Sequence, residues 1–266
     1  MSRAEAPGLL ELRAGDVRLV ASAADGGRLT SVTVGGRELL WSNRNDGLYG
    51  WGCYPMVPWA GRIRHGLFAF RGRDYQLPIS MPPHALHGVV LDRPWTVTAP
   101  DSMTIDLDDR WPFRGRVRQD FALSEDGLAV TLTVEADESM PAMVGWHPWF
   151  RRVLGEGEAP VTLEFEAAEM LVRDAEGLPT GERVVPPPGP WDDAFTAVLG
   201  GPTLRWPGLK LELGATCEWW VVYSQPDHAV CVEPQSGPPN AANSRPDVAA
   251  PGAPLAHTMN WRWSRT

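Results

Sequence analysis

Two histidines separated by two residues are the first candidates for chemistry in this chain. His84 and His87 lie in the segment Pro83–Gly88. Neutral imidazoles are common metal ligands, so such a pair invites a metal interpretation. In an extended segment, however, this spacing points the two rings to opposite sides, and no third ligand lies nearby in the sequence. We therefore expect no metal here, with one His hydrogen-bonded to a polar ligand and the other structural.

Three further segments place a polar side chain among apolar or turn residues. His147 lies in the aromatic segment 145–150, a context that taken alone is typical of a buried structural histidine. An apolar strand pattern runs into Glu233, so this carboxylate emerges at a strand end before a loop rich in Gly and Pro. Asp192 follows a proline-rich loop, where an aspartate either forms a turn or binds a ligand hydroxyl.

Tryptophan is unusually frequent, with 13 Trp against 7 Phe and 4 Tyr. Core packing explains most of them. Trp59, Trp146 and Trp149 lie beside candidate polar residues, and the face of an indole ring stacks well on the C–H face of a sugar. These three are candidates for lining a cleft, and we select Trp149 as a binding candidate.

Several familiar catalytic motifs are absent from the sequence. It contains no GxGxxG, GxxxxGKS/T, GxSxG or HExxH, which removes support for dinucleotide, P-loop, α/β-hydrolase and zincin chemistry. Lys210 is the single lysine among 24 basic residues. Schiff-base chemistry would depend on this residue, which we expect on the solvent face of an alternating strand.

Composition limits the class of protein and its partners. The 266 residues are 43% hydrophobic and 21% charged, a balance that supports a buried core. A net charge of −9 argues against nucleic acid and membrane surfaces as partners. The three cysteines form no CxxC pair, so neither a disulfide scaffold nor a zinc ribbon is indicated. Because Met1–Pro7 lacks a signal-peptide core and no stretch could span a bilayer, we expect a cytoplasmic protein.

Short strand patterns must position these side chains, and no segment has convincing helical periodicity. The 27 glycines and 26 prolines also favour a turn-rich β protein. Strands are predicted over 29–34, 37–41, 67–70, 75–77, 117–123, 128–134, 161–165, 209–213, 219–223, 229–232 and 259–263, and loops over 71–74, 185–190 and 246–254. We therefore predict an all-β, large antiparallel β-sandwich that forms a single domain over residues 1–266.

Five segments resemble those of one known family, in this order along the chain. They are residues 55–68, 84–88, 145–150, 191–195 and 231–243. Together they resemble the aldose 1-epimerases, also called galactose mutarotases. The resemblance implies a galactose mutarotase-like supersandwich with an open sugar cleft and with neither cofactor nor metal. The implied partner is a small-molecule sugar, an aldohexose or related aldose, bound by a monomer or homodimer.

The same resemblance implies roles for individual residues. His147, which precedes an aromatic pair, falls at the family's general acid, and Glu233 of the Glu-x-Gln motif falls at its general base. The remaining positions are substrate-binding candidates: Arg62, His87, Asp192 and Gln235, to which we add Trp149.

The chemistry that these roles imply follows from elementary acid–base arguments. Opening a pyranose ring removes a proton from the C1 hydroxyl and delivers one to the ring oxygen. A glutamate with an ordinary pKa of about 4.3 is ionised at neutral pH, and a histidine near about 6.5 can supply a proton. After rotation about the C1–C2 bond the roles reverse and the ring closes on the other face. No metal, nucleotide or covalent nucleophile is needed.

The chain departs from the family pattern at two positions, and other functions compete with this one. Trp146 and Gly61 stand where the family often has Asn, which leaves the preferred aldose open.

A hexose-6-phosphate mutarotase on the same fold would need a cluster of arginines to bind the phosphate. For the arginines of this chain that could form such a cluster, a solvated surface role is favoured. The arginines concerned are Arg62, Arg64, Arg71, Arg73, Arg114, Arg116 and Arg118.

Two further alternatives belong to other functional classes. A non-catalytic carbohydrate-binding β-sandwich would keep the aromatic residues and Asp192, but it would not need His147 and Glu233 together. A glycoside hydrolase would use Asp192 and Glu233 as its paired carboxylates.

Overall fold

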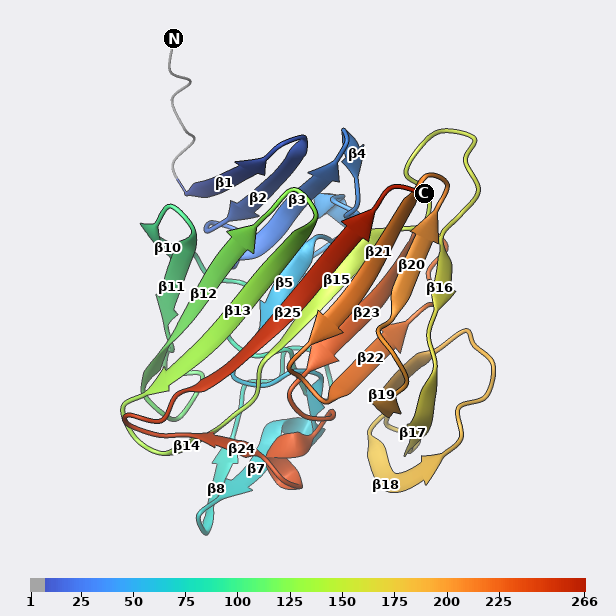
Figure 1. The fold of residues 1–266 in the computed structure, drawn as a ribbon. Helices are drawn as coiled ribbons and strands as arrows, with labels where there is room; N and C mark the ends of the chain where they lie inside the picture. Colours follow the sequence, from blue (N-terminus) through green and yellow to red (C-terminus); the bar gives the residue numbers. More distant parts are fainter. Residues whose placement is uncertain (1–7) are drawn as a thin grey trace.

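Two large antiparallel sheets pack face to face in the computed structural model, which describes residues 8–266 (Figure 1). The predicted all-β sandwich is therefore confirmed. Met1–Pro7, where the sequence predicts no signal peptide, lies outside the described residues. Within residues 8–266, no helix is long and apolar enough to cross a membrane.

The larger sheet contains the strands that matter most for function. Along the sheet, its strands are β1 (Leu9–Ala14), β2 (Val17–Ser22), β3 (Arg28–Val34), β5 (Cys53–Met56), β15 (Gly145–Arg151), β23 (Ala229–Gln235), β22 (Trp219–Tyr223), β19 (Asp192–Val198), β17 (Ala167–Arg173) and β18 (Pro179–Val184), and β4 (Arg37–Glu38) pairs with β3.

The smaller sheet covers one face of the larger one. Its strands, in order, are β10 (Thr96–Ala99), β11 (Ser102–Asp106), β12 (Gly115–Leu123), β13 (Gly127–Ala136), β25 (Leu255–Ser264), β21 (Leu209–Ala215), β20 (Thr203–Trp206) and β16 (Thr162–Glu164).

Short ribbons and single turns of helix complete the fold. The ribbons pair β6 (Arg62–Ile63) with β9 (Ala85–Leu86), β7 (Leu67–Phe70) with β8 (Arg73–Gln76), and β14 (Met140–Ala142) with β24 (Asp247–Ala249). The 3₁₀ turns are η1 (Arg44–Asp46), η2 (Arg64–Gly66) and η3 (Ala241–Asn243).

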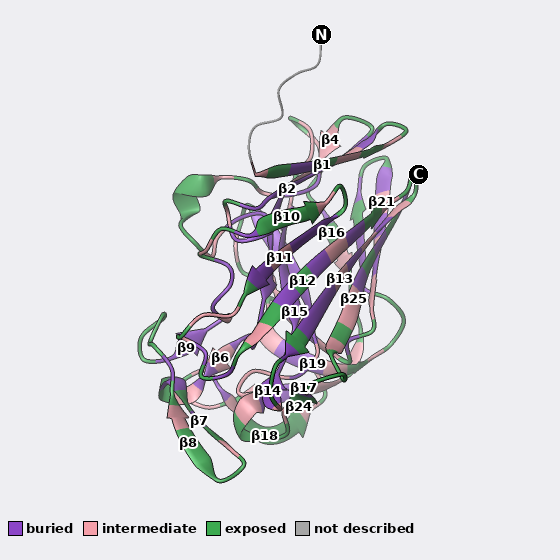
Figure 2. Cartoon of the chain, turned by 90° about the vertical axis from the view of Figure 1, so that its left-hand side faces the viewer, coloured by how far each residue is buried: buried purple, intermediate pink, exposed green. Residues whose placement is uncertain are grey.

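Alternation of apolar and polar residues builds the smaller sheet. In β12, Val117 and Phe121 are buried, whereas Arg116 and Arg118 between and beside them are exposed (Figure 2). Successive side chains of a strand point to opposite faces, so one face packs on the core and the other meets water. The strands predicted over 117–123 and 128–134 are confirmed as β12 and β13.

The core between the sheets fixes which residues of the larger sheet face outward. Phe150 of β15 packs on Trp261 of β25, with ring centroids 4.9 Å apart, and Val232 of β23 belongs to the same core. Because neighbouring residues alternate, His147 and Glu233 point away from the smaller sheet. The outer face of the larger sheet therefore carries the polar candidates.

The structure corrects two details of the predicted connections. The turn predicted over 71–74 is shorter, since β8 begins at Arg73 and pairs it with Phe70. The loop predicted over 246–254 contains β24, in which Val248 lies opposite Pro141. Three residues carry too little alternation to reveal a strand whose partner is distant in sequence.

Candidate active site

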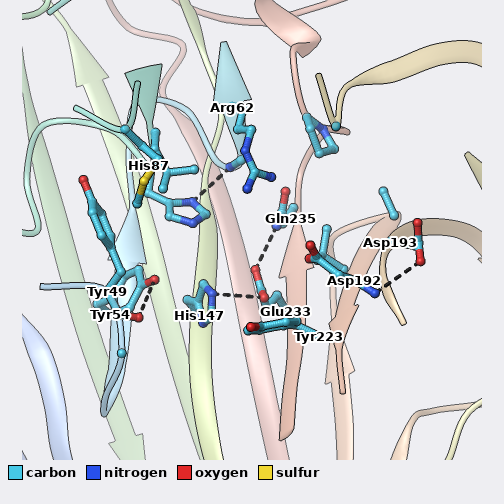
Figure 3. A pocket seen from close by; sticks show the side chains of 18 of the residues that line it. Tyr49, Tyr54, Arg62, His87, His147, Asp192, Asp193, Tyr223, Glu233 and Gln235 are labelled. Atoms are coloured by element: carbon cyan, nitrogen blue, oxygen red, sulfur yellow. Dashed lines mark hydrogen bonds and ion pairs between the residues drawn. The ribbon is translucent and has the colours of Figure 1, made fainter. Parts of the chain in front are cut away.

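A pocket of about 500 Å³ lies over β15, β23 and β22 on the outer face of the larger sheet (Figure 3). This volume is typical of sites for small molecules. The pocket brings together every site residue predicted from the sequence: Arg62, His87, His147, Trp149, Asp192, Glu233 and Gln235.

His147 and Glu233 face each other across two adjacent strands. His147 Nε2 lies 3.2 Å from Glu233 Oε1, and both side chains are almost fully buried. The antiparallel pairing of β15 with β23 brings these two residues together although they are far apart in the sequence. The close approach makes the two groups one proton-sharing unit.

The second oxygen of Glu233 is held from the same strand. Gln235 Nε2 donates to Glu233 Oε2 over 3.2 Å. Gln235 Oε1 is buried, and no group within residues 8–266 hydrogen-bonds to it. An oxygen in this position can accept a hydrogen bond from a ligand hydroxyl.

The imidazole of His147 is sandwiched between two aromatic rings. Tyr54 of β5 stacks on it with centroids 4.8 Å apart and planes inclined by 26°, and Trp149 stacks at 5.2 Å and 12°. Tyr54 lies directly opposite His147 in the pairing of β5 with β15. The two rings fix the plane of the imidazole, so that its Nε2 edge faces Glu233.

His87 enters from the opposite side of the pocket on a strained loop. Its main chain has φ of +58°, and at Gly88 a Cβ would approach Val57 O to 1.9 Å. Gly88 must therefore be glycine, which explains the Leu-His-Gly sequence. His87 Nδ1 accepts a hydrogen bond from the Gly61 amide over 3.1 Å, so the neutral ring carries its proton on Nε2.

Asp192 closes a third side of the pocket with a cation that the sequence did not reveal. Arg173 Nη1 lies 3.2 Å from Asp192 Oδ2, and Arg173 Nε lies 2.9 Å from Asp193 Oδ1. The amide of Asp192 donates to Asp193 Oδ2 over 3.2 Å. Tyr223 of β22 lies opposite Asp192 in the sheet and also lines the pocket.

Burial changes the protonation of the central pair. It raises the pKa of Glu233 well above 4.5, and the charge of Asp192 adds to this rise. It lowers the pKa of His147 well below 6.5, and the charges of His87 and Arg28 add to this fall. The pKa of His87 falls to about 3, again through burial and then through the charge of Arg62. Ordinary pKa values predict an ionised Glu233 beside a His147 that titrates near neutral pH, whereas burial favours a pair that holds its single proton on the carboxyl.

Comparison with known proteins agrees with this arrangement. A family model described as aldose 1-epimerase matches residues 8–194. The chain belongs to the aldose 1-epimerase family. The matched range includes Arg62, His87, His147 and Asp192, but Glu233 lies beyond it, so the position of Glu233 rests on the pocket geometry.

The proteins similar to this family member match different shares of its chain. The protein YphB of Escherichia coli K12 is 36% identical over 105 residues, which are 37% of this chain and 36% of that protein. The protein YihR of the same organism is 25% identical over 226 residues, which are 73% of this chain and 72% of that protein. The crystal structure of a galactose mutarotase-like protein from Clostridium acetobutylicum has a TM-score of 0.86 at 16% identity and covers 96% of this chain and 95% of its own. This similarity shows that the two chains share a fold.

One group of side chains at the edge of the pocket, within the described residues, offers ligand atoms for a metal ion. His147, Cys231 and Glu233 offer ligand atoms that all lie within 4.8 Å of one another. A nitrogen, sulfur and oxygen set of this kind suits zinc. The thiol would have to lose its proton, and burial raises the pKa of Cys231 well above 9.0, an effect that Glu233 reinforces. The donor set is therefore poorly prepared for a metal, and the chemistry proposed below uses proton transfer alone.

Sequence reasoning missed several pocket residues, and of the three tryptophans considered for lining a cleft, only Trp149 lines this pocket. Trp59 and Trp146 are buried in the core rather than in the pocket. Tyr54 and Arg173 line the pocket, but neither lies in a segment with a recognisable motif. Alternation in β17 is too weak to have identified Arg173 as a pocket residue, because burial along that strand is only partial.

Proposed function

We propose that this protein is an aldose 1-epimerase that interconverts the α and β anomers of a free aldose. Glu233 is the general base and His147 the general acid. The observation that carries the proposal is the 3.2 Å separation of His147 Nε2 and Glu233 Oε1 in a pocket of sugar size. The hydroxyl oxygen and the ring oxygen of a pyranose are both bonded to C1, so an acid and a base acting on them must be neighbours.

The reaction balances with these two groups alone. Passage of the shared proton from Glu233 to His147 yields a carboxylate and an imidazolium 3.2 Å apart. Glu233 then takes the proton of the C1 hydroxyl while His147 protonates the ring oxygen, so the C1–O bond of the ring breaks and the C1 carbonyl forms. After rotation about C1–C2, the C5 hydroxyl attacks the carbonyl, His147 recovers its proton and Glu233 returns the other.

The remaining pocket residues suit a polyhydroxylated ligand. The Nε2 proton of His87, the guanidinium of Arg62 and the free oxygen of Gln235 supply donors and an acceptor around the pair. Trp149 offers an apolar ring face to the sugar. Asp192, held by Arg173, accepts hydrogen bonds from sugar hydroxyls.

Polarimetry on freshly dissolved α-D-glucose and α-D-galactose tests the proposed function. We expect the wild-type protein to accelerate the approach to anomeric equilibrium on at least one of them, and to do so equally after dialysis against EDTA. If the protein binds either sugar in calorimetry without accelerating its mutarotation, it is a carbohydrate-binding module. Release of reducing sugar from a disaccharide would instead indicate a glycoside hydrolase.

The charges in the pocket favour an unphosphorylated substrate. The carboxylates of Asp46, Asp192 and Asp193 line it beside the carboxyl group of Glu233 and the guanidiniums of Arg62 and Arg173. Since Arg173 is paired with Asp192 and Asp193, Arg62 is the guanidinium of the pocket left to meet a phosphate group. Three of the other arginines considered for phosphate binding, Arg64, Arg116 and Arg118, have carboxylate partners, as Arg64 does in Asp174.

We expect the protein to prefer glucose over glucose 6-phosphate. Because a phosphate dianion would lie among carboxylates, kcat/KM for the phosphorylated sugar should be at least about tenfold lower. Polarimetry with each sugar measures the ratio, and inorganic phosphate is added at constant ionic strength with chloride as the control. Competitive inhibition by phosphate, but not by chloride, would contradict the expectation.

A further inference from the structure

Arg28 is a buried cation that lies outside the pocket. It begins β3, and only 1% of its surface is exposed. No carboxylate within residues 8–266 forms an ion pair with it, since neighbouring Asp25 pairs with Arg44. Burial lowers the pKa of Arg28 to about 10, so it remains charged at neutral pH. A buried charge without a counter-ion is costly, and its contacts indicate what it does.

The guanidinium holds the loop that forms one wall of the pocket. One nitrogen of Arg28 donates to the carbonyl of Trp51, and Nη2 donates to the carbonyl of Leu48 over 2.7 Å. Residues 46–50 of this loop line the pocket. A planar fork with fixed donor directions is suited to joining two carbonyls.

Arg28 also lies against the aromatic ring that supports His147. Its Cζ is 4.6 Å from the centroid of Tyr54 and 4.3 Å from that of Trp51. In the sheet, β5 lies between β3 and β15, so Tyr54 stands between Arg28 and His147. Tyr54 OH donates to the carbonyl of Tyr49 over 3.2 Å, which ties the ring to the same loop. Guanidinium, phenol ring and imidazole thus follow one another in a stack.

We propose that Arg28 is a positioning residue for the reaction, which fixes Tyr54 and the loop 46–50 so that His147 is held toward Glu233. The inference rests on the proposed mutarotase function. Arg28 does not reach the pocket and acts through Tyr54.

The same stack places positive charge near the proton that His147 must release. The titratable groups facing His147 are Glu233 and Cys231 from β23, His87 from the loop after β9, and Tyr54 from β5. The charge of Arg28 acts from β3 and contributes to the lowered pKa of His147. Removing that charge should therefore raise the pKa of His147 and weaken it as an acid.

Two substitutions of Arg28 and one matched control test this role. Arg28→Met keeps an apolar stem but removes the fork and the charge, whereas Arg28→Lys keeps the charge without the fork. Arg44→Met is the control, because Arg44 lies 4.8 Å from the centroid of the same Trp51 but pairs with Asp25 at the surface. Circular dichroism checks folding, polarimetry gives kcat and KM, and NMR follows the titration of the His147 ring.

For Arg28→Met we expect kcat to fall by about 10²-fold with little change in KM, since a misplaced acid affects the transition state more than binding. The pKa of His147 should rise. In Arg28→Lys, kcat should be higher than in Arg28→Met, and the pKa of His147 should lie close to its wild-type value. Arg44→Met should match the wild type in both. If Arg28→Met yields no folded protein, Arg28→Lys and Tyr54→Leu, which removes the ring between the two groups, carry the test.

Folded variants at position 28 with wild-type kcat and unchanged His147 titration would overturn the proposal. A loss of kcat that only follows the folded fraction, with His147 titrating as in the wild type, would also overturn it. If the wild-type protein accelerates no aldose, the proposed function fails separately, and the His147 titration alone then decides the role of Arg28.

Discussion

Glu233→Gln should lower kcat for mutarotation by about 10²–10⁴-fold, with KM nearly unchanged. Glutamine has the same shape and keeps an oxygen for the hydrogen bond from Gln235, but it cannot take the proton of the C1 hydroxyl. Polarimetry on the best aldose measures the loss. Glu212→Gln is the matched control, because Glu212 is an exposed carboxylate of β21 that pairs with Lys210.

The same substitution should make the protein more stable at neutral pH and above. Burial raises the pKa of Glu233, so the folded protein prefers the protonated form. Its contribution to stability is full below the unfolded pKa of about 4.3 and is lost as pH rises through the folded pKa. Glutamine stays neutral and removes that loss, so the Tm of Glu233→Gln should exceed that of the wild type at pH 8.

A combined gain in Tm and loss of kcat would separate a catalytic carboxylate from a structural one. A structural Glu233 would give a lower Tm, because its replacement would break a stabilising contact. Retention of kcat in a folded Glu233→Gln would refute its role as the base, whereas loss of activity in Glu212→Gln would point to a fault in the preparation.

The pattern of apolar residues predicts the strands that have one wet face. In β12, β13 and β21 buried apolar residues alternate with outward positions that are polar or small, so alternation reveals each strand. β15 is different, because Gly145 to Phe150 are all buried. One of its faces packs on the core and the other carries His147 and Trp149 into the pocket, so polarity does not alternate.

The candidate site could be predicted only where the chain marks it locally. His87 is followed by Gly88, and Glu233 is followed two residues later by Gln235, so the local sequence and its resemblance to a family identify them. No local sequence motif identifies Arg28. Its contacts depend on β3 and β5 becoming neighbours, which is a property of the sheet order rather than of the adjacent residues.

Burial explains why ordinary pKa values do not describe the pair of His147 and Glu233. Ordinary pKa values describe side chains in water, and they predict an ionised Glu233 beside a His147 that titrates near neutral pH. The folded chain removes both groups from water, which disfavours each charged form. In the proposed reaction, the pair keeps the single proton that ring opening needs, and the two charges separate only when a sugar is bound.

His147→Asn should lower kcat by about 10²–10⁴-fold, because asparagine cannot protonate the ring oxygen. For the wild type we expect a bell-shaped dependence of kcat/KM on pH, since the pair is active with one proton. Full protonation removes the base, and because the pKa of His147 is lowered, this acidic limb lies below 6.5. Full deprotonation removes the acid, and because the pKa of Glu233 is raised, the alkaline limb lies above 4.5. The apparent pKa values that define the two limbs belong to the coupled pair rather than to either residue.

Although His147→Asn should lower activity, it should make the folded protein less sensitive to acid. A histidine whose folded pKa is lowered contributes stability above its unfolded pKa of about 6.5, and this is lost as pH falls toward the folded pKa. The wild type should therefore lose Tm below pH 6.5 more steeply than His147→Asn, which binds no proton there. His257→Asn is the matched control, because His257 lies on β25 outside the pocket and bonds Thr216. An acidic limb and an acid-dependent Tm that persist unchanged in His147→Asn would show that another group carries the proton.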